Sequence, residues 1–297
     1  MELCLGTVQF GLDYGIIGQK KPSLEYAVRC LDYATQNGIR AIDTATAYGT
    51  AEQVTGAFLA KKTIPRDKLF ISTKLLPNIL DECAPERLEK AVCENLQHSL
   101  QTLHLDYVDA YLLHSARYAF RPDILAALVG VQKEGLARKV GVSVYEPEEA
   151  LACYDSPYVD FIQAPYSIFD HRMKKSGALQ QAKAGGCEVH TRSAFIQGLI
   201  LLQEEQVPPY LEKAKPILCK IDAICKQTGI SRIALAMSYV KRESAISHLV
   251  FGVDSLEQLK EDIALFQQDL PASLLAEMDS EFAGIDAEIV MPSLWKK

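Results

Sequence analysis

Four side chains of different chemistry lie at or just beyond the ends of short apolar runs. They are a carboxylate, a phenol, an ammonium and an imidazole, at Asp43, Tyr48, Lys74 and His114, and we call these four residues the tetrad. A phenol is a poor proton donor at neutral pH, and a neighbouring ammonium lowers its pKa by favouring the phenolate. A buried lysine keeps its charge beside a carboxylate, so Lys74 needs Asp43. The tetrad predicts a proton-transfer site in which Tyr48 is the donor and His114 orients a carbonyl group.

Apolar or β-branched runs alternate with helix-period segments along the chain. Strands are expected at residues 3–5, 39–43, 69–73, 107–113, 139–144, 159–163, 187–192 and 247–251. Helices are expected at 24–36, 51–59, 86–103, 124–134, 147–154, 173–183, 211–227, 233–240 and 256–266. Strands that are apolar on both faces and followed by helices belong to α/β folds with buried parallel sheets. The count favours a closed (β/α)8 TIM barrel.

A doubly wound dinucleotide-binding sheet is the competing architecture. It would carry G-x-G-x-x-G after its first strand, whereas the segment at 6–11 reads GTVQFG. The sequence contains no Pro/Ser-rich linker or low-complexity block, so we expect residues 1–297 to form a single domain. In a barrel the catalytic groups lie at the C-terminal ends of the strands, where the tetrad residues are found.

Composition excludes several classes of protein. The chain has 297 residues, of which 48% are hydrophobic and 23% charged, and its net charge is −7 with scattered basic residues. We therefore expect no nucleic-acid partner, because no electropositive stripe is present to follow phosphates. No apolar run approaches the roughly 20 residues of a membrane span, and no secretory leader is recognisable, which predicts a cytoplasmic protein. The eight cysteines form no CxxC pair and are expected to be reduced thiols, and no metal site is expected.

The segments DTATAYG at 43–49, STK at 72–74 and LLHS at 112–115 resemble the motifs of the aldo-keto reductases. The resemblance runs from GTVQFG at residue 6 to SLEQLKED at residue 255. It implies a (β/α)8 barrel, a small carbonyl substrate, and hydride transfer from NADPH or NADH to the carbonyl carbon. Under this reading the hydroxyl of Tyr48 protonates the oxygen.

The same resemblance implies where the cofactor lies. Ser143 and Gln163 match positions that hold the nicotinamide carboxamide, although Val144 replaces the usual Asn. Arg192 stands where many relatives have a Tyr that stacks on the nicotinamide ring, and a guanidinium can also stack. The remaining expected contacts are Gly6 and Thr7 near the first strand, Ser193, Phe195 and Gly198 after the seventh, and Gly252, Asp254, Gln258 and Asp262 after the eighth.

Cofactor choice is expected to depend on the segment from Gly252 to Asp262. Relatives that prefer NADPH usually carry Lys or Arg here, because a 2′-phosphate is best held by a cation. Asp254 would repel that phosphate, while Gln258 and Lys260 provide partial compensation. We expect dual use or NADH use.

One feature departs from the family pattern at the bottom of the barrel, and a second set of residues is expected to form the walls of the pocket. Many relatives carry an N-terminal hairpin that plugs the bottom of the barrel, whereas this chain begins almost on its first strand, and the C-terminal segment is a candidate cover for that end. Aromatic or basic residues in the βα loops and the tail are candidate pocket walls: Tyr14, Arg117, Tyr118, Tyr145, Tyr166 and Trp295.

Other functions remain open at this point. Lys74 could serve a Schiff-base aldolase, since a desolvated lysine at a strand end can attack a carbonyl. The fold could also belong to a non-catalytic NAD(P)H-binding sensor or assembly subunit. The sequence indicates neither the physiological substrate nor the oligomeric state.

Overall fold

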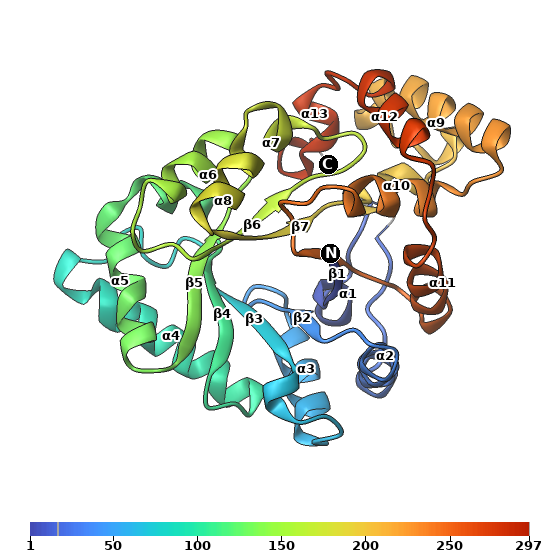
Figure 1. The fold of residues 1–297 in the computed structure, drawn as a ribbon. Coiled ribbons are helices and arrows are strands. Elements are labelled where there is room, and N and C mark those ends of the chain that lie inside the picture. Colours follow the sequence, from blue (N-terminus) through green and yellow to red (C-terminus); the bar gives the residue numbers. More distant parts are fainter. Residues whose placement is uncertain (17, 297) are drawn as a thin grey trace.

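The computed structural model describes residues 1–16 and 18–296 (Figure 1). Eight parallel strands close into a barrel in the order β1 to β8, and β1 pairs with β8 to complete the ring. This confirms the (β/α)8 barrel. The strands are β1 (Glu2–Gly6), β2 (Ala41–Asp43), β3 (Phe70–Leu75), β4 (Val108–Leu113), β5 (Ala137–Ser143), β6 (Phe161–Pro165), β7 (Glu188–Arg192) and β8 (His248–Phe251).

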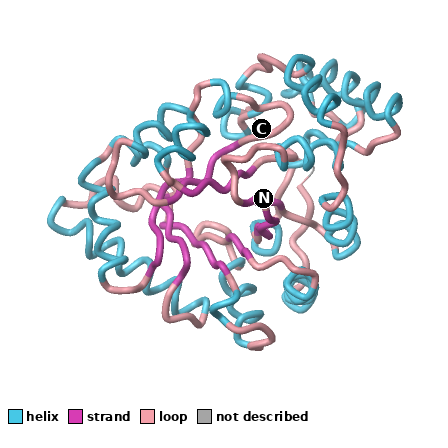
Figure 2. The backbone as a smooth tube through the Cα atoms, in the orientation of Figure 1, coloured by secondary structure: helices cyan, strands magenta, loops and turns pink. Residues whose placement is uncertain are grey.

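Helices surround the strands (Figure 2). Those that follow the expected pattern are α2 (Leu24–Gln36), α3 (Ala51–Ala60), α4 (Leu88–Leu103), α5 (Pro122–Lys133), α6 (Pro147–Tyr154), α10 (Arg232–Lys241) and α11 (Leu256–Phe266). The helix expected at 173–183 is two helices, α7 (Arg172–Lys175) and α8 (Ala178–Gly185), because Gly177 adopts a left-handed φ of 79°. The helix expected at 211–227 is α9 (Lys215–Thr228), preceded by a 3-10 segment. Three short helices were not expected: α1 (Val8–Gly11), α12 (Ala272–Glu281) and α13 (Ala287–Val290).

Two apolar layers build the protein. The larger packs the outer faces of the strands against the helices, which is why the strands are apolar on both sides. The smaller fills the middle of the barrel with two groups of residues that share Phe70, namely Cys4, Ala41 and Val250, and Ala110, Leu112 and Phe161. Polar side chains occupy the barrel interior above and below this middle layer.

The two ends of the barrel differ in what covers them. The C-terminal ends of the strands open into a cavity whose lining includes Pro292 and Ser293 from the C-terminal segment. That segment therefore lies at the mouth of the barrel, and the expectation that it covers the bottom is wrong. The bottom is formed by side chains of the strands themselves, among them Glu188, His190 and His248.

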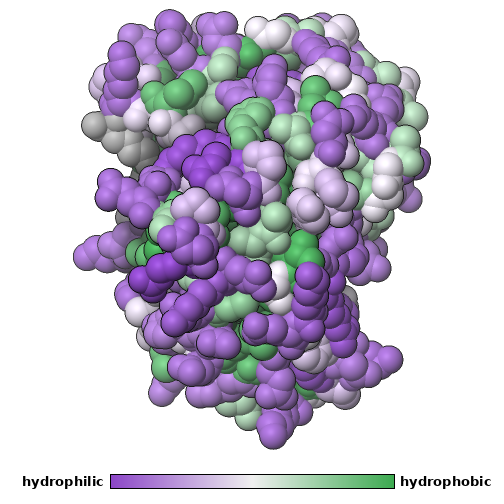
Figure 3. Space-filling model, turned by 90° about the vertical axis from the view of Figure 1, so that its left-hand side faces the viewer, coloured by the Kyte–Doolittle hydropathy of each residue, from purple (hydrophilic) through white to green (hydrophobic). Residues whose placement is uncertain are grey.

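The surface shown in Figure 3 is mostly hydrophilic, with small separated apolar patches. In the described part of the chain, no helix is both long and apolar enough to cross a bilayer. All eight cysteines are free thiols, and four of them, Cys4, Cys30, Cys93 and Cys153, are buried.

Candidate active site

A buried ion pair lies at the centre of the mouth. Asp43 is the last residue of β2, and Lys74 lies on the neighbouring β3. The Nζ atom of Lys74 lies 2.8 and 2.7 Å from the two carboxylate oxygens of Asp43 and 2.9 Å from the carbonyl oxygen of Thr44. These three contacts use all three hydrogens of the ammonium, so Lys74 is held as a charged, fully paired group.

Asp43 accepts two further hydrogen bonds that fix its position. Ser72 Oγ donates from 2.9 Å and Gln163 Nε2 from 2.8 Å, both to Oδ1. The donors come from β3 and β6, so the carboxylate joins strands on opposite sides of the barrel. Removing this group would leave several buried donors without an acceptor.

Tyr48 is positioned by the loop between β2 and α3. Its N–H donates to the carbonyl oxygen of Ala45 at 3.0 Å, and the Thr46 hydroxyl donates to the carbonyl oxygen of Lys74 at 3.0 Å. Helix α1 packs closely on this loop: a Cβ atom on Gly11 would lie 1.8 Å from the carbonyl oxygen of Tyr48. Glycine at position 11 therefore permits the contact that holds the tyrosine loop in place.

The phenol and the imidazole meet above the ion pair. The rings of Tyr48 and His114 pack edge to face, with centroids 5.5 Å apart and an interplanar angle of 81°. The ammonium of Lys74 lies 4.9 Å from the centroid of the Tyr48 ring. The structure thus brings together all four tetrad residues from β2, its following loop, β3 and the end of β4.

Burial dominates the electrostatics of the phenol. It raises the pKa of Tyr48 above the usual value near 10, and the charge of Asp43 raises it further. Arg192 is the cation that opposes this rise. The sequence predicted the reverse, a pKa lowered by Lys74, but that ammonium is neutralised by Asp43. Tyr48 is therefore protonated at neutral pH.

His114 is held neutral by its surroundings. Burial lowers its pKa to about 3, and the charges of Lys74 and Arg192 act in the same direction. Its Nδ1 atom is buried and has no hydrogen-bond partner among the described residues. A neutral imidazole presents one donor and one acceptor, so it can hydrogen-bond a carbonyl oxygen without becoming charged.

The site lies in a cavity of about 670 Å³ at the C-terminal ends of the strands, lined by Asp43, Tyr48 and His114. The aldo/keto reductase family model matches residues 2–281 of this sequence. The chain belongs to the aldo-keto reductase family. It is an NAD(P)H-dependent oxidoreductase, as its family is.

Relatives and solved structures agree with this assignment. The reductase is 26% identical over 286 residues to the NADH-specific methylglyoxal reductase of Escherichia coli (strain K12), covering 84% of this chain and 87% of that protein. It is 32% identical over 174 residues to an aldo-keto reductase of Mycolicibacterium smegmatis, covering 57% of each. Its fold is similar to that of an aldo-keto reductase from Bacillus halodurans in the holo form, with a TM-score of 0.76 at 21% identity, over 99% of this chain and 95% of that chain.

Most residues expected to contact the cofactor line the cavity of the reductase. They are Gly6, Ser143, Gln163, Arg192, Ser193, Phe195, Gly198, Gly252, Asp254 and Gln258. Thr7 and Asp262 do not line it: both are fully buried, and the Thr7 hydroxyl donates to the carbonyl oxygen of Asp43 at 3.0 Å. Their expected cofactor contacts stay predictions.

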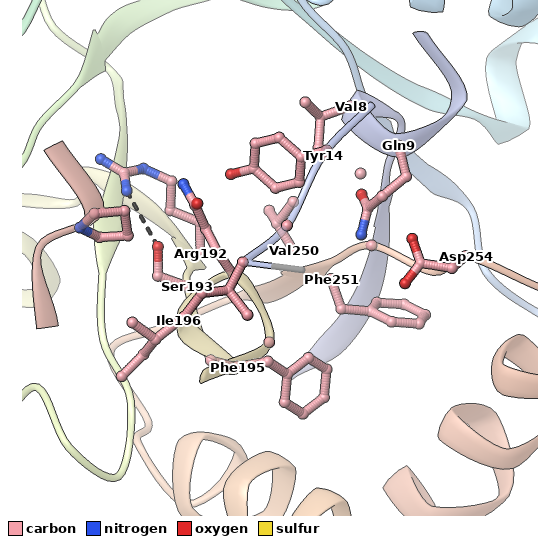
Figure 4. Close-up of a pocket in the computed structure, with 18 of the residues that line it drawn as sticks. Val8, Gln9, Tyr14, Arg192, Ser193, Phe195, Ile196, Val250, Phe251 and Asp254 are labelled. Atoms are coloured by element: carbon pink, nitrogen blue, oxygen red, sulfur yellow. Dashed lines mark hydrogen bonds between the residues drawn. The ribbon is translucent and has the colours of Figure 1, made fainter. Parts of the chain in front are cut away.

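The cavity lining fits a nicotinamide cofactor on two observations. Gly252 has no side chain where a Cβ would meet the Gln9 amide at 2.0 Å, so this amide can lie against the backbone that follows β8 at the cavity wall. The Gln9 Oε1 atom is buried and has no hydrogen-bond partner among the described residues, which leaves it available to a bound donor. Figure 4 shows Gln9 and Asp254 on one side of the cavity and Arg192 and Ser193 on the other.

Arg192 is fixed at the end of β7. It donates to the carbonyl oxygen of Val144 at 2.8 Å and to the Ser193 hydroxyl at 3.2 Å, and its guanidinium lies 4.3 Å from the centroid of the Tyr145 ring. No carboxylate of the described residues pairs with it within 4.0 Å. The cavity therefore contains a guanidinium whose charge is not neutralised by a salt bridge.

Some wall residues were expected and others were missed. Tyr14 and Tyr145 line the cavity as proposed, whereas Arg117, Tyr118, Tyr166 and Trp295 lie elsewhere. Arg117 and Tyr118 bind Asp81, and Tyr166 stacks on Tyr239 in the core. Gln9 was missed although it sits in the GTVQFG segment beside Gly6. Pro292 and Ser293 were missed because no sequence signal links the tail to the mouth.

Proposed function

We propose that this reductase converts an aldehyde or ketone to an alcohol, with Tyr48 as the proton donor. The observation that carries this proposal is the convergence of a protonated phenol and a neutral imidazole above a buried ion pair, at the mouth of the barrel. When bound, the nicotinamide supplies the hydride. The groups of the chain then have to hold the carbonyl and deliver one proton.

Tyr48 can deliver that proton because the phenol is protonated at neutral pH, and the charge of Arg192 opposes the rise in pKa that weakens the phenol as an acid. The alkoxide that develops as hydride adds is a stronger base than a phenolate, so proton transfer from the phenol is favourable. His114 can hydrogen-bond the carbonyl oxygen beside the phenol. The ion pair of Lys74 and Asp43 lies below both rings and joins β2 to β3. The hydrogen bond from Thr46 to the carbonyl oxygen of Lys74 holds the loop after β2 against β3.

The cavity lining favours a polar carbonyl compound. The residues that line it include several with polar side chains: Gln9, Tyr14, Gln19, Arg192, Gln197 and Gln206. Polar groups in a pocket select substrates that satisfy their hydrogen bonds. Methylglyoxal, the substrate named for the Escherichia coli relative, and small aldoses are the first compounds to assay.

The aldolase alternative is not favoured by the environment of Lys74. A Schiff-base lysine must offer a free lone pair, which requires a neutral amine. Here the ammonium is bound by both oxygens of Asp43 and by Thr44. A non-catalytic sensor would bind the nucleotide without consuming it, so turnover measurements distinguish that alternative directly.

The test is the Tyr48→Phe variant, which removes the hydroxyl and keeps the ring. We expect kcat to fall at least about a hundredfold, the scale of general acid catalysis, while the Kd for the reduced cofactor stays within about threefold. The matched control is Tyr14→Phe, which removes a hydroxyl from the same cavity and should cost less than about tenfold. Wild-type turnover in Tyr48→Phe would refute the assignment of the donor.

A further inference from the structure

A second polar cluster lies toward the N-terminal ends of the strands, away from the mouth that holds the tetrad. Glu188 and His190 lie two residues apart on β7, so both face the interior, and His248 on β8 pairs in register with His190. The Nε2 atom of His190 lies 2.9 Å from the Oε1 atom of Glu188, and the Nδ1 atom of His248 lies 3.8 Å from the same oxygen. One ligand atom from each residue lies within 4.8 Å of the other two.

We propose that Glu188, His190 and His248 form a divalent metal site for Zn²⁺ or an ion of similar preference. Two imidazoles and a carboxylate are a donor set that Zn²⁺ uses, with bond lengths of about 2.0–2.2 Å. Tetrahedral ligands at those lengths lie about 3.3 Å apart. The separations in the cluster lie on both sides of that value, so small side-chain shifts would close the shell around an ion.

Packing keeps the two imidazoles in place. The His190 ring lies 4.1 Å from the His248 ring, and it also packs on Phe161 at 4.5 Å and Phe70 at 5.1 Å between centroids. The His190 side chain has no exposed surface, and its Nδ1 atom has no hydrogen-bond partner among the described residues. These ring contacts limit rotation of the imidazoles and exclude water from one side of the cluster.

The open side of the cluster offers access and a further ligand. A cavity of about 460 Å³ is lined by Glu188, Lys139 and neighbouring residues, and it reaches the cluster at Glu188. The carboxylate of Glu2 lies 3.7 Å from the Nε2 atom of His248, and its side chain is 74% exposed, so it is free to move. Because Nε2 is not the ring nitrogen that faces Glu188, this carboxylate would orient the His248 imidazole, and water would complete a four-ligand shell.

The ammonium of Lys139 would compete with a bound metal ion for the carboxylate of Glu188. This ammonium pairs with the Oε2 atom of Glu188, so a bound cation would share that carboxylate with a positive charge. The Lys139 side chain is 41% exposed and can move into solvent. Removing its charge should therefore strengthen metal binding, which a purely structural ion pair would not do.

The experiment is calorimetric titration of chelator-treated, full-length protein with Zn²⁺. All proteins carry Cys219→Ser, because the exposed Cys219 thiol beside Glu204 is an alternative place for the ion. We expect one strong equivalent in this background, at least about tenfold weaker binding in Glu188→Gln and in His248→Gln, and about threefold or more tighter binding in Lys139→Met. His98→Gln, at an exposed histidine of α4, is the control and should bind unchanged.

Two measurements keep the proposal open to refutation if the Glu188→Gln or His248→Gln variant folds poorly. Circular dichroism reports folding, and X-ray absorption of the Zn²⁺-loaded Cys219→Ser protein counts imidazole ligands without any further change. Two imidazoles at the ion support the site. Fewer than two, or a Zn²⁺ affinity that is the same in Cys219→Ser and in its Glu188→Gln and Lys139→Met derivatives, would overturn it.

Discussion

Lys74 gives every ammonium hydrogen to Asp43 and Thr44, and both members of the ion pair are almost completely buried. A buried charge that loses its partner is far more costly than a buried pair. Asp43 retains hydrogen bonds from Ser72 and Gln163 when Lys74 is removed, but its negative charge is then uncompensated. The energetics of the pair can therefore be tested separately from catalysis.

We expect Lys74→Met to lower the free energy of unfolding by about 3–5 kcal/mol at neutral pH, because it leaves the Asp43 carboxylate buried alone. The double variant Lys74→Met/Asp43→Asn should recover part of that loss, since no unpaired charge remains. Urea unfolding of wild type, both single variants and the double variant measures the coupling. Additive losses would show that the two side chains do not stabilise one another.

The tetrad could be predicted because each residue stands at a strand end, or five positions beyond one, in a chain whose strands are recognisable. The direction in which the Tyr48 pKa is shifted could not be predicted from the sequence. It depends first on the burial of the phenol and then on the nearby charge of Asp43, which together outweigh the opposing charge of Arg192. Burial and the pairing of charges are tertiary properties that spacing along the sequence does not contain.

The start of helix α11 and the residues just before it line one side of the cavity, to which they contribute Asp254 and Gln258. Ser255 caps the helix by accepting from the N–H of Gln258 at 3.1 Å, and the Oε1 atom of Gln258 accepts from the N–H of Asp254 at 2.9 Å. These contacts orient the Gln258 amide and leave the Asp254 carboxylate exposed at the rim. A carboxylate at this place disfavours a bound phosphate.

We expect wild-type enzyme to bind NADH as well as NADPH or better. Asp254→Arg should shift the ratio of the two Kd values toward NADPH by about tenfold or more, because a repulsion is replaced by a charge-assisted contact. Asp254→Asn, which removes only the repulsion, should give an intermediate ratio. Fluorescence titration with each nucleotide measures the ratios, and wild-type binding of NADPH at least about a hundredfold tighter than NADH would contradict the expectation.

At the level of elements, strand positions were predicted to within about two residues, because a buried parallel strand is a short apolar run between polar segments. Most helix ends were predicted equally well, and the exceptions are the break between α7 and α8 and the start of α9. The break between α7 and α8 depends on the left-handed backbone at Gly177, and the start of α9 follows a 3-10 turn from Pro209 to Ala214. Such local choices are made by packing against neighbours and not by periodicity alone.

Across the whole molecule, one buried acid couples stability to pH. Asp262 on α11 is fully buried, and neither of its carboxylate oxygens has a hydrogen-bond partner in the described residues. Burial, with a smaller contribution from Glu261, raises its pKa to about 7. The folded protein therefore holds this proton more tightly than the unfolded chain, in which the pKa is near 3.9. Stability falls as pH rises through this interval and is level above it.

We expect Asp262→Asn to remove this dependence. Its stability relative to wild type should increase by about 2.7 kcal/mol between pH 5 and pH 7 and then level off, because wild type must bury an ionised carboxylate at high pH. Thermal unfolding of the cofactor-free proteins at several pH values measures the difference. Asp269→Asn, at an exposed aspartate, is the control. A difference between Asp262→Asn and wild type that is constant with pH would show that Asp262 titrates normally.

The ring of strands is closed by residues at opposite ends of the chain. Strand β1 pairs with β2 through residues 4–6 and 41–43, but its other edge pairs with β8 through residues 2–5 and 248–251. During synthesis on the ribosome, the first pairing can form early, whereas the second waits until nearly all of the barrel has emerged. An open strand edge is a template for pairing with other chains. The nascent chain thus carries an unpaired edge of β1 for most of its translation, and chaperones that shield β1 would act before the barrel closes.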